Sequence, residues 1–230
     1  MLERIKKEIN SFKSKERAKI NSYFFKTGKG EYAEKDKFLG VRVPVLRKIA
    51  KKYKEISLKD IECLLMSEIH EYRFIALVFL INKYKKERLN QEKIFNFYIK
   101  NAKYIDNWDL VDISAPHIFG DYLLSKNKEI LYNFLKSHNL WRRRIAIVSC
   151  FAFIKNNDFK DIIKIAKISL NDKHDLIHKA CGWMLRELGK RDKSKLRKFL
   201  DQYYQKMPRV CLRYALERMS QREKEKYMKK

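Results

Sequence analysis

Glycine, proline and long apolar runs are all scarce in this sequence of 230 residues. With 6 glycines and 3 prolines, the chain offers few of the turn signals that separate short strands. The longest apolar run, residues 74–81, is far too short to span a bilayer. The first ten residues, MLERIKKEIN, are charged throughout and do not resemble a secretory signal. We therefore expect a cytoplasmic protein with no membrane partner.

Paired cysteine motifs are also absent. The 4 cysteines stand far apart and none belongs to a CxxC pair. Each falls in a helical apolar pattern, where a free thiol behaves as a small hydrophobic group. We predict buried, unpaired thiols in a reducing compartment at Cys63, Cys150, Cys181 and Cys211.

Apolar residues recur at intervals of three and four along most of the chain, and no convincing period-two alternation is present. This pattern predicts an all-α fold. The exception is the stretch 26–44, which holds three of the glycines and reads as a long basic loop. Helices are expected near residues 2–25, 44–54, 58–67, 71–86, 90–102, 107–124, 127–136, 141–155, 159–169, 174–190, 194–205 and 208–227.

The three prolines and two polar residues suggest where some helices begin. Pro44 and Pro208 fit the first turn of their helices, because proline lacks the N–H that this turn leaves unused. Asp106 or Asn107 can cap the helix that follows. Pro116 implies a kink or a restart, with Ser114 as a possible cap.

A weak internal repeat runs through the helices. Small residues inside amphipathic segments recur at spacings of 39, 31, 34 and 35, namely Ala76, Ala115, Ala146, Ala180 and Ala215. Periods of this size with two helices per unit are typical of HEAT- or TPR-like arrays, and TPR signal residues are absent. We predict one domain over residues 1–230, built as a HEAT-like helical repeat solenoid with a concave basic face.

Acidic residues are too few to balance the basic ones: 54 Lys and Arg stand against 28 Asp and Glu, a net charge of +26. The excess is spread along the chain, with +10 in residues 1–60, +6 in 61–185 and +10 in 186–230. AT-rich coding bias alone inflates lysine, but it also supplies Asn and Glu. The imbalance therefore favours a polyanionic partner such as nucleic acid.

Most familiar catalytic motifs are missing. Gly28-Lys29-Gly30 lacks the GK[ST] ending of a phosphate loop, and no GxSxG or paired Cys/His arrangement is present. His174 and His178 lie four residues apart, but without HExxH or a matching carboxylate they favour a structural role over a metal site. We expect no metal and no cofactor.

The segment between Lys103 and Lys126 contains no Lys or Arg and carries a formal net charge of −4 from Asp106, Asp109, Asp112 and Asp121. Carboxylates near a helix start suit the helix dipole, which accounts for the first two. Asp112 lies deeper and shares a helix face with Trp108, four residues before it. A carboxylate beside an indole in so basic a protein indicates a cationic substrate.

The other two tryptophans also have basic neighbours one helical turn away. Trp141 precedes Arg144, and Trp183 lies between Lys179 and Arg186. A lone tryptophan at helical spacing is more often a core residue, but three of them in residues 108–183 favour a binding surface.

Four separated motifs together resemble the AlkD-like DNA alkylation repair family, in the right order over roughly residues 20–220. They are KFLGVRVP at 37–44, NWDLVD at 107–112, WRRR at 141–144 and KACGWMLRE at 179–187. The resemblance implies a HEAT-like solenoid and a DNA glycosylase that excises N3- and N7-alkylated purines.

The same resemblance implies roles for single residues. Trp108 and Trp183 would be aromatic walls of the lesion site, Asp112 the catalytic carboxylate, and Arg144 a contact to the DNA backbone. Tyr32 would be the aromatic residue from the N-terminal helices, and Asn107 stands where some relatives carry another aromatic. The further candidates for DNA binding are Arg42, Arg47, Arg143, Lys179 and Arg186.

The chemistry of alkylated purines agrees with these assignments. Alkylation makes the base cationic and weakens its glycosidic bond, and bond breaking develops oxocarbenium character on the sugar. We therefore predict a monofunctional glycosylase that acts on duplex DNA containing alkylated purines, works as a monomer and requires no protein partner. The alternatives are a non-catalytic nucleic-acid-binding repeat protein and a protein–protein scaffold.

Overall fold

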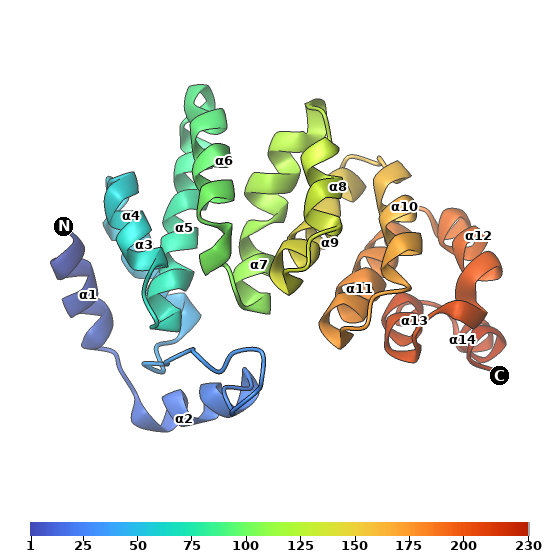
Figure 1. The fold of residues 1–230 in the computed structure, drawn as a ribbon, viewed down its shortest axis with the longest axis horizontal. Helices are drawn as coiled ribbons and strands as arrows, with labels where there is room; N and C mark the ends of the chain where they lie inside the picture. Colours follow the sequence, from blue (N-terminus) through green and yellow to red (C-terminus); the bar gives the residue numbers. More distant parts are fainter. Residues whose placement is uncertain (230) are drawn as a thin grey trace. The chain divides into compact units, whose positions relative to one another are not determined.

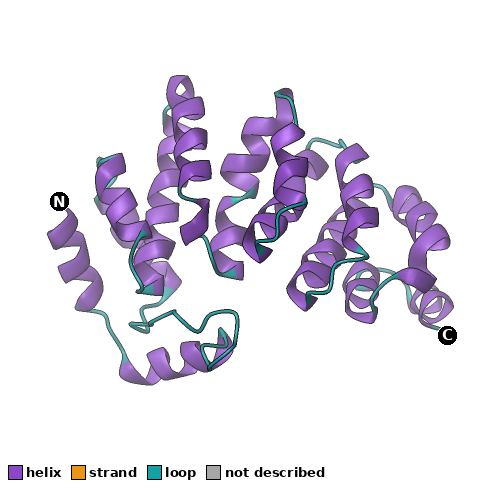
Figure 2. Ribbon diagram, viewed as in Figure 1, coloured by secondary structure: helices purple, strands orange, loops and turns teal. Residues whose placement is uncertain are grey.

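The computed structural model describes residues 1–229, in which 14 α-helices and no β-strands occur (Figure 2). The all-α prediction is confirmed. No helix in this part of the chain has the length and apolar character needed to cross a membrane. The α-helices are α1 (Leu2–Asn10), α2 (Lys15–Phe24), α3 (Val43–Lys52), α4 (Leu58–Leu65), α5 (His70–Lys86), α6 (Gln91–Lys100), α7 (Trp108–Ser114), α8 (Glu129–Leu135), α9 (Leu140–Lys155), α10 (Lys160–Ser169), α11 (Asp175–Arg191), α12 (Lys193–Tyr203), α13 (Arg209–Leu216) and α14 (Gln221–Met228).

The chain forms two compact units, Met1–Ser114 and Ala115–Lys230, which we call the N-terminal and C-terminal units. In the N-terminal unit, α5 packs against α3, α4, α6 and α7 (Figure 1). Because neighbours surround α5, its apolar residues occur all around the helix, and Phe74, Ile75, Ala76 and Leu77 are all buried. The prediction of a single domain over the whole chain stays a prediction.

In the C-terminal unit, α9 packs against α8, α10 and α11, and α11 packs against α10, α12 and α13 (Figure 1). The five alanines of the sequence repeat are each 0–1% exposed. Four of them lie on α5, α9, α11 and α13, where a small side chain lets a neighbouring helix approach. The prediction of a helical repeat fold is therefore confirmed.

Two helices expected as continuous are each split in the structure. The segment 2–25 breaks between α1 and α2, where the Ser14 side chain accepts a hydrogen bond from Arg17 N and caps α2. The segment 208–227 breaks between α13 and α14, where Ser220 and Glu223 form a capping box. Serine favours these breaks because its hydroxyl binds backbone N–H groups that a continuous helix would use itself.

The segment expected as a helix over 107–124 is divided as well. After α7 comes a π-helical turn, Pro116–Gly120, in which Gly120 N donates to Ala115 O at 2.8 Å. This wider turn accommodates Pro116, which has no N–H. The prediction of Ser114 as a cap is wrong: its hydroxyl donates to Leu110 O and also bonds the Tyr98 hydroxyl.

The other two prolines lie at helix starts. Pro44 occupies the first turn of α3, as predicted, and Pro208 is the N-cap residue of α13.

The connection between α2 and α3, residues 25–42, is a long loop without a helix, close to the predicted stretch 26–44. Its backbone is fixed to the start of α5 and to the residues just before that helix. Lys37 N donates to Glu68 O, and Lys37 O accepts from His70 N. The Glu71 carboxylate accepts from three loop N–H groups, including that of Gly40. Gly40 has φ +79°, and a side chain there would collide with the backbone of Ser14.

The prediction of four buried thiols is wrong for Cys63, which lies exposed on α4. Ile61, Leu64 and Leu65 form the buried face of this short helix, and Cys63 lies on the opposite face. The other three cysteines are buried, and all four are unpaired.

Candidate functional site

The acidic segment singled out in the sequence begins with α7, at the end of the N-terminal unit. Leu110, Val111 and Ser114 form the buried side of this helix. Trp108 and Asp112, four residues apart, are both partly exposed. The spacing therefore places an indole and a carboxylate on the same helix, outside its buried face.

An aromatic cluster supports the Trp108 indole. The Phe25 ring stacks on it with centroids 5.1 Å apart, and the Phe24 ring meets it edge-on at 5.8 Å. Phe25 in turn stacks on Phe38 at 5.2 Å. Phe24 is 61% exposed, so the cluster reaches the surface at the end of α2. Tyr32, the aromatic residue expected from the N-terminal helices, lies in the 25–42 loop instead of a helix.

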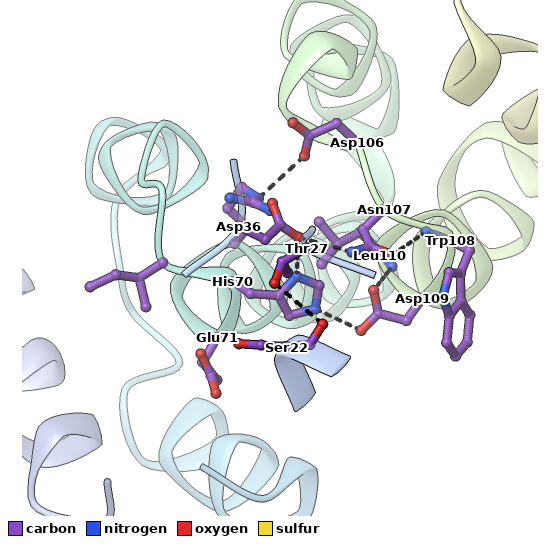
Figure 3. A network of polar contacts seen from close by, with 12 residues as sticks. Ser22, Thr27, Asp36, His70, Glu71, Asp106, Asn107, Trp108, Asp109 and Leu110 are labelled. Carbon is purple, nitrogen blue, oxygen red and sulfur yellow. Dashed lines mark hydrogen bonds and ion pairs between the residues drawn. The ribbon is translucent and has the colours of Figure 1, made fainter. Parts of the chain in front are cut away.

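A buried polar network adjoins this cluster at His70, and its side chains are drawn in Figure 3. The Asp36 carboxylate accepts from Arg73 at 2.5 Å, from Asn107 at 2.9 Å and from the His70 ring, whose Nδ1 lies 3.0 Å away. Burial alone would raise the pKa of Asp36, but the His70 hydrogen bond and the Arg73 charge hold it below its usual value. Asp36 therefore carries its charge inside the protein and binds the loop to α5 and to the start of α7.

His70 joins Asp36 to Asp109, because its Nε2 lies 2.8 Å from an Asp109 oxygen. Burial would lower the pKa of His70, but the Asp109 charge, its hydrogen bond and the hydrogen bond to Asp36 raise it to about 9. The His70 ring also stacks on Phe38 at 4.7 Å. The network and the aromatic cluster thus meet at His70.

The sequence suggested that Asp106 and Asp109 favour the helix dipole. In the structure, both also bind basic side chains of α5. Asp109 binds His70, and Asp106 lies 3.4 Å from the Arg73 guanidinium. Burial is the main reason that the pKa of Asp106 is raised. Asn107 rather than Asp106 receives the first N–H of the helix, since its Oδ1 accepts from Trp108 N at 2.7 Å.

Sequence reasoning missed Asp36, His70 and Arg73. Asp36 lies 71 residues from its partner Asn107, and His70 lies 39 residues from its partner Asp109, so no local spacing connects them to α7. The available signal was a histidine and an arginine in a segment that is otherwise apolar. Such residues can be buried only with partners of opposite charge.

A pocket of about 340 Å³ opens beside the network in the N-terminal unit. Phe25, Phe38, His70 and Asp109 are among the residues that line it. Arg17 and Arg42, both exposed, stand at its edge. Arg42 is the N-cap residue of α3, and Arg47, another DNA-binding candidate, is exposed on the same helix.

The remaining candidates belong to the C-terminal unit. Trp183 is partly exposed on α11, with the Phe151 ring 6.1 Å away. Trp141 is 7% exposed and is a core residue of α9. Arg144 is buried on α9, and its guanidinium donates to Leu176 O at 2.6 Å.

Three basic candidates in this unit form ion pairs. Arg143 pairs with Asp172 at 2.7 Å and also donates to two backbone carbonyls. Lys179 pairs with Asp175 at 2.6 Å. Arg186 pairs with Glu217. These contacts fix where each cation lies on the surface.

The two histidines that were considered as metal ligands have structural contacts. His174 caps α11 through its Nδ1, which accepts from Leu176 N, and the His178 ring bonds Asp172 O. Within residues 1–229, no group of three or more His, Cys, Asp or Glu side chains is placed to hold a metal ion.

The structure therefore brings Trp108 and Asp112 together on α7, with Tyr32, Arg42 and Arg47 in the same unit. Trp183, Arg143, Arg144, Lys179 and Arg186 belong to the C-terminal unit.

Comparison with known proteins gives the family. Among solved structures, the chain is similar to a protein from Enterococcus faecalis named as a predicted DNA alkylation repair enzyme. The two share 18% sequence identity and a TM-score of 0.73, over 91% of this chain and 97% of the other, a likeness of fold. No curated protein matches the chain. The family model for DNA alkylation repair enzymes matches residues 5–219. Because this match spans nearly the whole sequence, the chain belongs to the DNA alkylation repair enzyme family, which supports a role in repairing alkylated DNA.

Proposed function

We propose that this protein is a monofunctional DNA glycosylase that hydrolyses the N-glycosidic bond of N3- or N7-alkylated purines in duplex DNA and leaves an abasic site. The observation that carries the proposal is the pair on α7. Trp108 and Asp112 are both partly exposed and lie outside the side of the helix that Leu110, Val111 and Ser114 bury. The family assignment supports a DNA substrate.

The substrate explains why an indole and a carboxylate suffice. An alkylated purine is already cationic, so it departs as a neutral base and needs no acid to protonate it. As the bond breaks, positive charge develops on the sugar. The ionised Asp112 carboxylate would stabilise that charge and orient the water that attacks the anomeric carbon.

The Trp108 indole would select the cationic nucleotide through its π-face. Support from Phe25 keeps one face of the indole covered, so the ring needs little ordering when DNA binds. In our proposal Trp183 contributes a second aromatic contact to the lesion. Partial exposure of Trp183 supports this assignment, and burial of Trp141 argues against such a role for that residue.

Basic residues would hold the phosphates on either side of the lesion. Arg42 and Arg47 are exposed on α3 and suit this task. Arg144 would bind the DNA backbone, and its bond to Leu176 O would fix the direction of the guanidinium. Lys179 and Arg186 extend the basic surface of α11, and Arg143 that of α9.

The experiment is a single-turnover assay with methylated duplex DNA, in which free 7-methylguanine and 3-methyladenine are measured and spontaneous loss without protein is subtracted. We expect Asp112→Asn to slow base release by about 10²- to 10³-fold, as when one charge-stabilising group is removed. Its affinity for undamaged DNA should remain within about twofold of wild type, because the carboxylate makes no favourable contact with phosphates.

Asp121→Asn is the matched control, since it removes another carboxylate of the same acidic stretch from an exposed position. It should release bases at the wild-type rate. Equal release by Asp112→Asn and wild type would refute the assigned mechanism. Tight DNA binding by wild type without any base release would favour a non-catalytic DNA-binding repeat protein.

A further inference from the structure

His70 occupies a position that no part of the proposed chemistry uses. Its side chain is 4% exposed, and each ring nitrogen faces a carboxylate. Nδ1 lies 3.0 Å from Asp36 and Nε2 lies 2.8 Å from Asp109. A carboxylate oxygen only accepts hydrogen bonds, so both nitrogens must donate. Only the imidazolium form has two N–H groups, and the geometry therefore requires a charged ring.

The charged groups around the ring come from three elements. Asp36 lies in the loop, Asp109 on α7 and Arg73 on α5, one turn after His70. Asp106 pairs with Arg73, and the Glu71 carboxylate is turned toward the loop backbone. Two carboxylates thus contact the imidazolium directly, which explains why so buried a histidine remains charged.

Two separate paths lead from His70 to Trp108. The first is a stack of rings: His70 on Phe38 at 4.7 Å, Phe38 on Phe25 at 5.2 Å, and Phe25 on Trp108 at 5.1 Å. Successive rings along it are inclined by 28°, 16° and 24°, and Phe25 also contacts His70 directly, with centroids 5.0 Å apart and an interplanar angle of 36°. A tilt of the imidazole would therefore be passed to the indole.

The second path is polar (Figure 3). The Asp36 oxygen that accepts from His70 also accepts from Asn107 Nδ2 at 2.9 Å. Asn107 Oδ1 in turn accepts from the backbone N–H of Trp108 at 2.7 Å. Asp109, the next residue after Trp108, bonds Nε2 directly. The backbone on both sides of Trp108 is thus tied to the same imidazolium.

We propose that His70 is a positioning residue for Trp108: as an imidazolium held between Asp36 and Asp109, it fixes the orientation in which the indole meets the alkylated base. The importance of that orientation for catalysis rests on the proposed function. The positioning itself is a property of the N-terminal unit and can be tested without DNA.

The test compares wild type with Asp109→Asn, which keeps the size of Asp109 and one of its two acceptor oxygens but removes its charge. Two signals are followed against pH. One is the ¹⁵N shift of the His70 ring, assigned by its loss in His70→Gln. The other is the ¹⁹F shift of 5-fluorotryptophan at position 108, assigned by its loss in Trp108→Phe.

In wild type we expect both His70 nitrogens to stay protonated until the pH approaches about 9. The Trp108 signal should change with the same midpoint. Asp109→Asn should lower both midpoints together by about one unit or more, because a neutral amide stabilises the imidazolium less than a carboxylate does. The signals of Trp141 and Trp183 serve as controls and should not follow this titration.

A neutral His70 ring at pH 7 would overturn the proposal. So would a lowered His70 midpoint with an unmoved Trp108 signal, which is the result expected if His70 were merely structural. The pH profile of single-turnover 7-methylguanine release should show the same lowering of its midpoint in Asp109→Asn relative to wild type. The affinity for undamaged DNA should be the same in the two proteins. Both proteins meet the same substrate, so ionisation of the DNA bases contributes equally to both profiles.

Failure of this proposal and failure of the proposed function give different results. If wild type releases no base from any methylated DNA, the glycosylase assignment is wrong, and the ¹⁹F and ¹⁵N signals still decide whether His70 positions Trp108. If wild type releases alkylated bases but the Trp108 signal does not titrate with His70, the glycosylase assignment is supported and the positioning role of His70 is refuted.

Discussion

At the scale of single residues, the N-terminal unit depends on a charge that no surface pattern reveals. The Asp36 side chain is 3% exposed, yet it remains ionised because three donors surround it. None of these donors lies in the loop that carries Asp36: His70 and Arg73 belong to α5, and Asn107 directly precedes α7. A buried ion pair contributes little when it is intact, but losing one partner leaves the other charge without compensation.

We therefore expect Asp36→Ala to lower the free energy of unfolding by about 3–5 kcal/mol, since Arg73 and His70 would lose a buried counter-charge. Urea denaturation at pH 7 measures this loss. Glu34→Ala is the control, because Glu34 lies two residues away in the same loop but is exposed. A similar loss in both variants would mean that the loop as a whole, and not the buried carboxylate, stabilises the unit.

The pH dependence of the two partners has opposite signs. The lowered pKa of Asp36 gives stability that is present above its unfolded value and is lost as the pH falls. The raised pKa of His70 gives stability that is complete below 6.5 and is lost as the pH rises through about 9. The polar network that holds Trp108 is therefore most stable at pH values where Asp36 is ionised and His70 is protonated.

At the scale of helices, close approach of α11 and α13 depends on Gly182. A β-carbon at this position would overlap the Cys211 carbonyl oxygen and meet Tyr214 Cβ at 2.6 Å. Neither atom can move without shifting α13. Gly189, also on α11, differs because an added β-carbon would meet the end of the flexible Leu196 side chain.

Gly182→Ala should therefore destabilise the protein by about 1–3 kcal/mol, as overpacking usually does. Gly189→Ala should be neutral or stabilising, because alanine favours a helix by about 0.5–1 kcal/mol over glycine and Leu196 can rotate away. Thermal unfolding of both variants tests the contrast. If Gly189→Ala proved the more harmful, backbone contact with α13 would not be what limits side-chain size on α11.

The sequence predicted the interiors of the helices well, because apolar periodicity and burial have the same cause. It predicted the breaks at Ser14 and Ser220 poorly, since the apolar pattern continues across them and only the capping hydrogen bonds end each helix. It correctly placed Trp108 and Asp112 on one helix, because a spacing of four residues is a local pattern. The His70 network depends on contacts between residues far apart in the chain, which no local pattern encodes.

At the scale of the whole molecule, the net charge of +26 makes a prediction about salt. Each phosphate that the protein neutralises releases condensed counterions, so affinity for DNA falls as salt rises. For 6–10 contacts we expect affinity for undamaged duplex to fall about 10³- to 10⁵-fold between 50 and 200 mM salt. Fluorescence anisotropy with labelled duplex measures the slope of the logarithm of the affinity against the logarithm of the salt concentration. A protein–protein scaffold would instead bind an acidic polypeptide in preference to DNA.

The slope also separates cations that meet phosphates from those that hold the fold together. Arg42 and Arg47 are exposed on α3, so replacing both with alanine should reduce the slope by about two units without loss of stability. Arg143 is already engaged by Asp172 and two carbonyls, so Arg143→Ala should alter the slope less and lower the unfolding temperature more. The reverse result, an unchanged slope in Arg42→Ala/Arg47→Ala and a reduced one in Arg143→Ala, would place the phosphate contacts on α9 and not on α3. Because salt acts on every phosphate contact and on no uncharged one, this comparison stays informative even if the lesion preference differs from the one proposed.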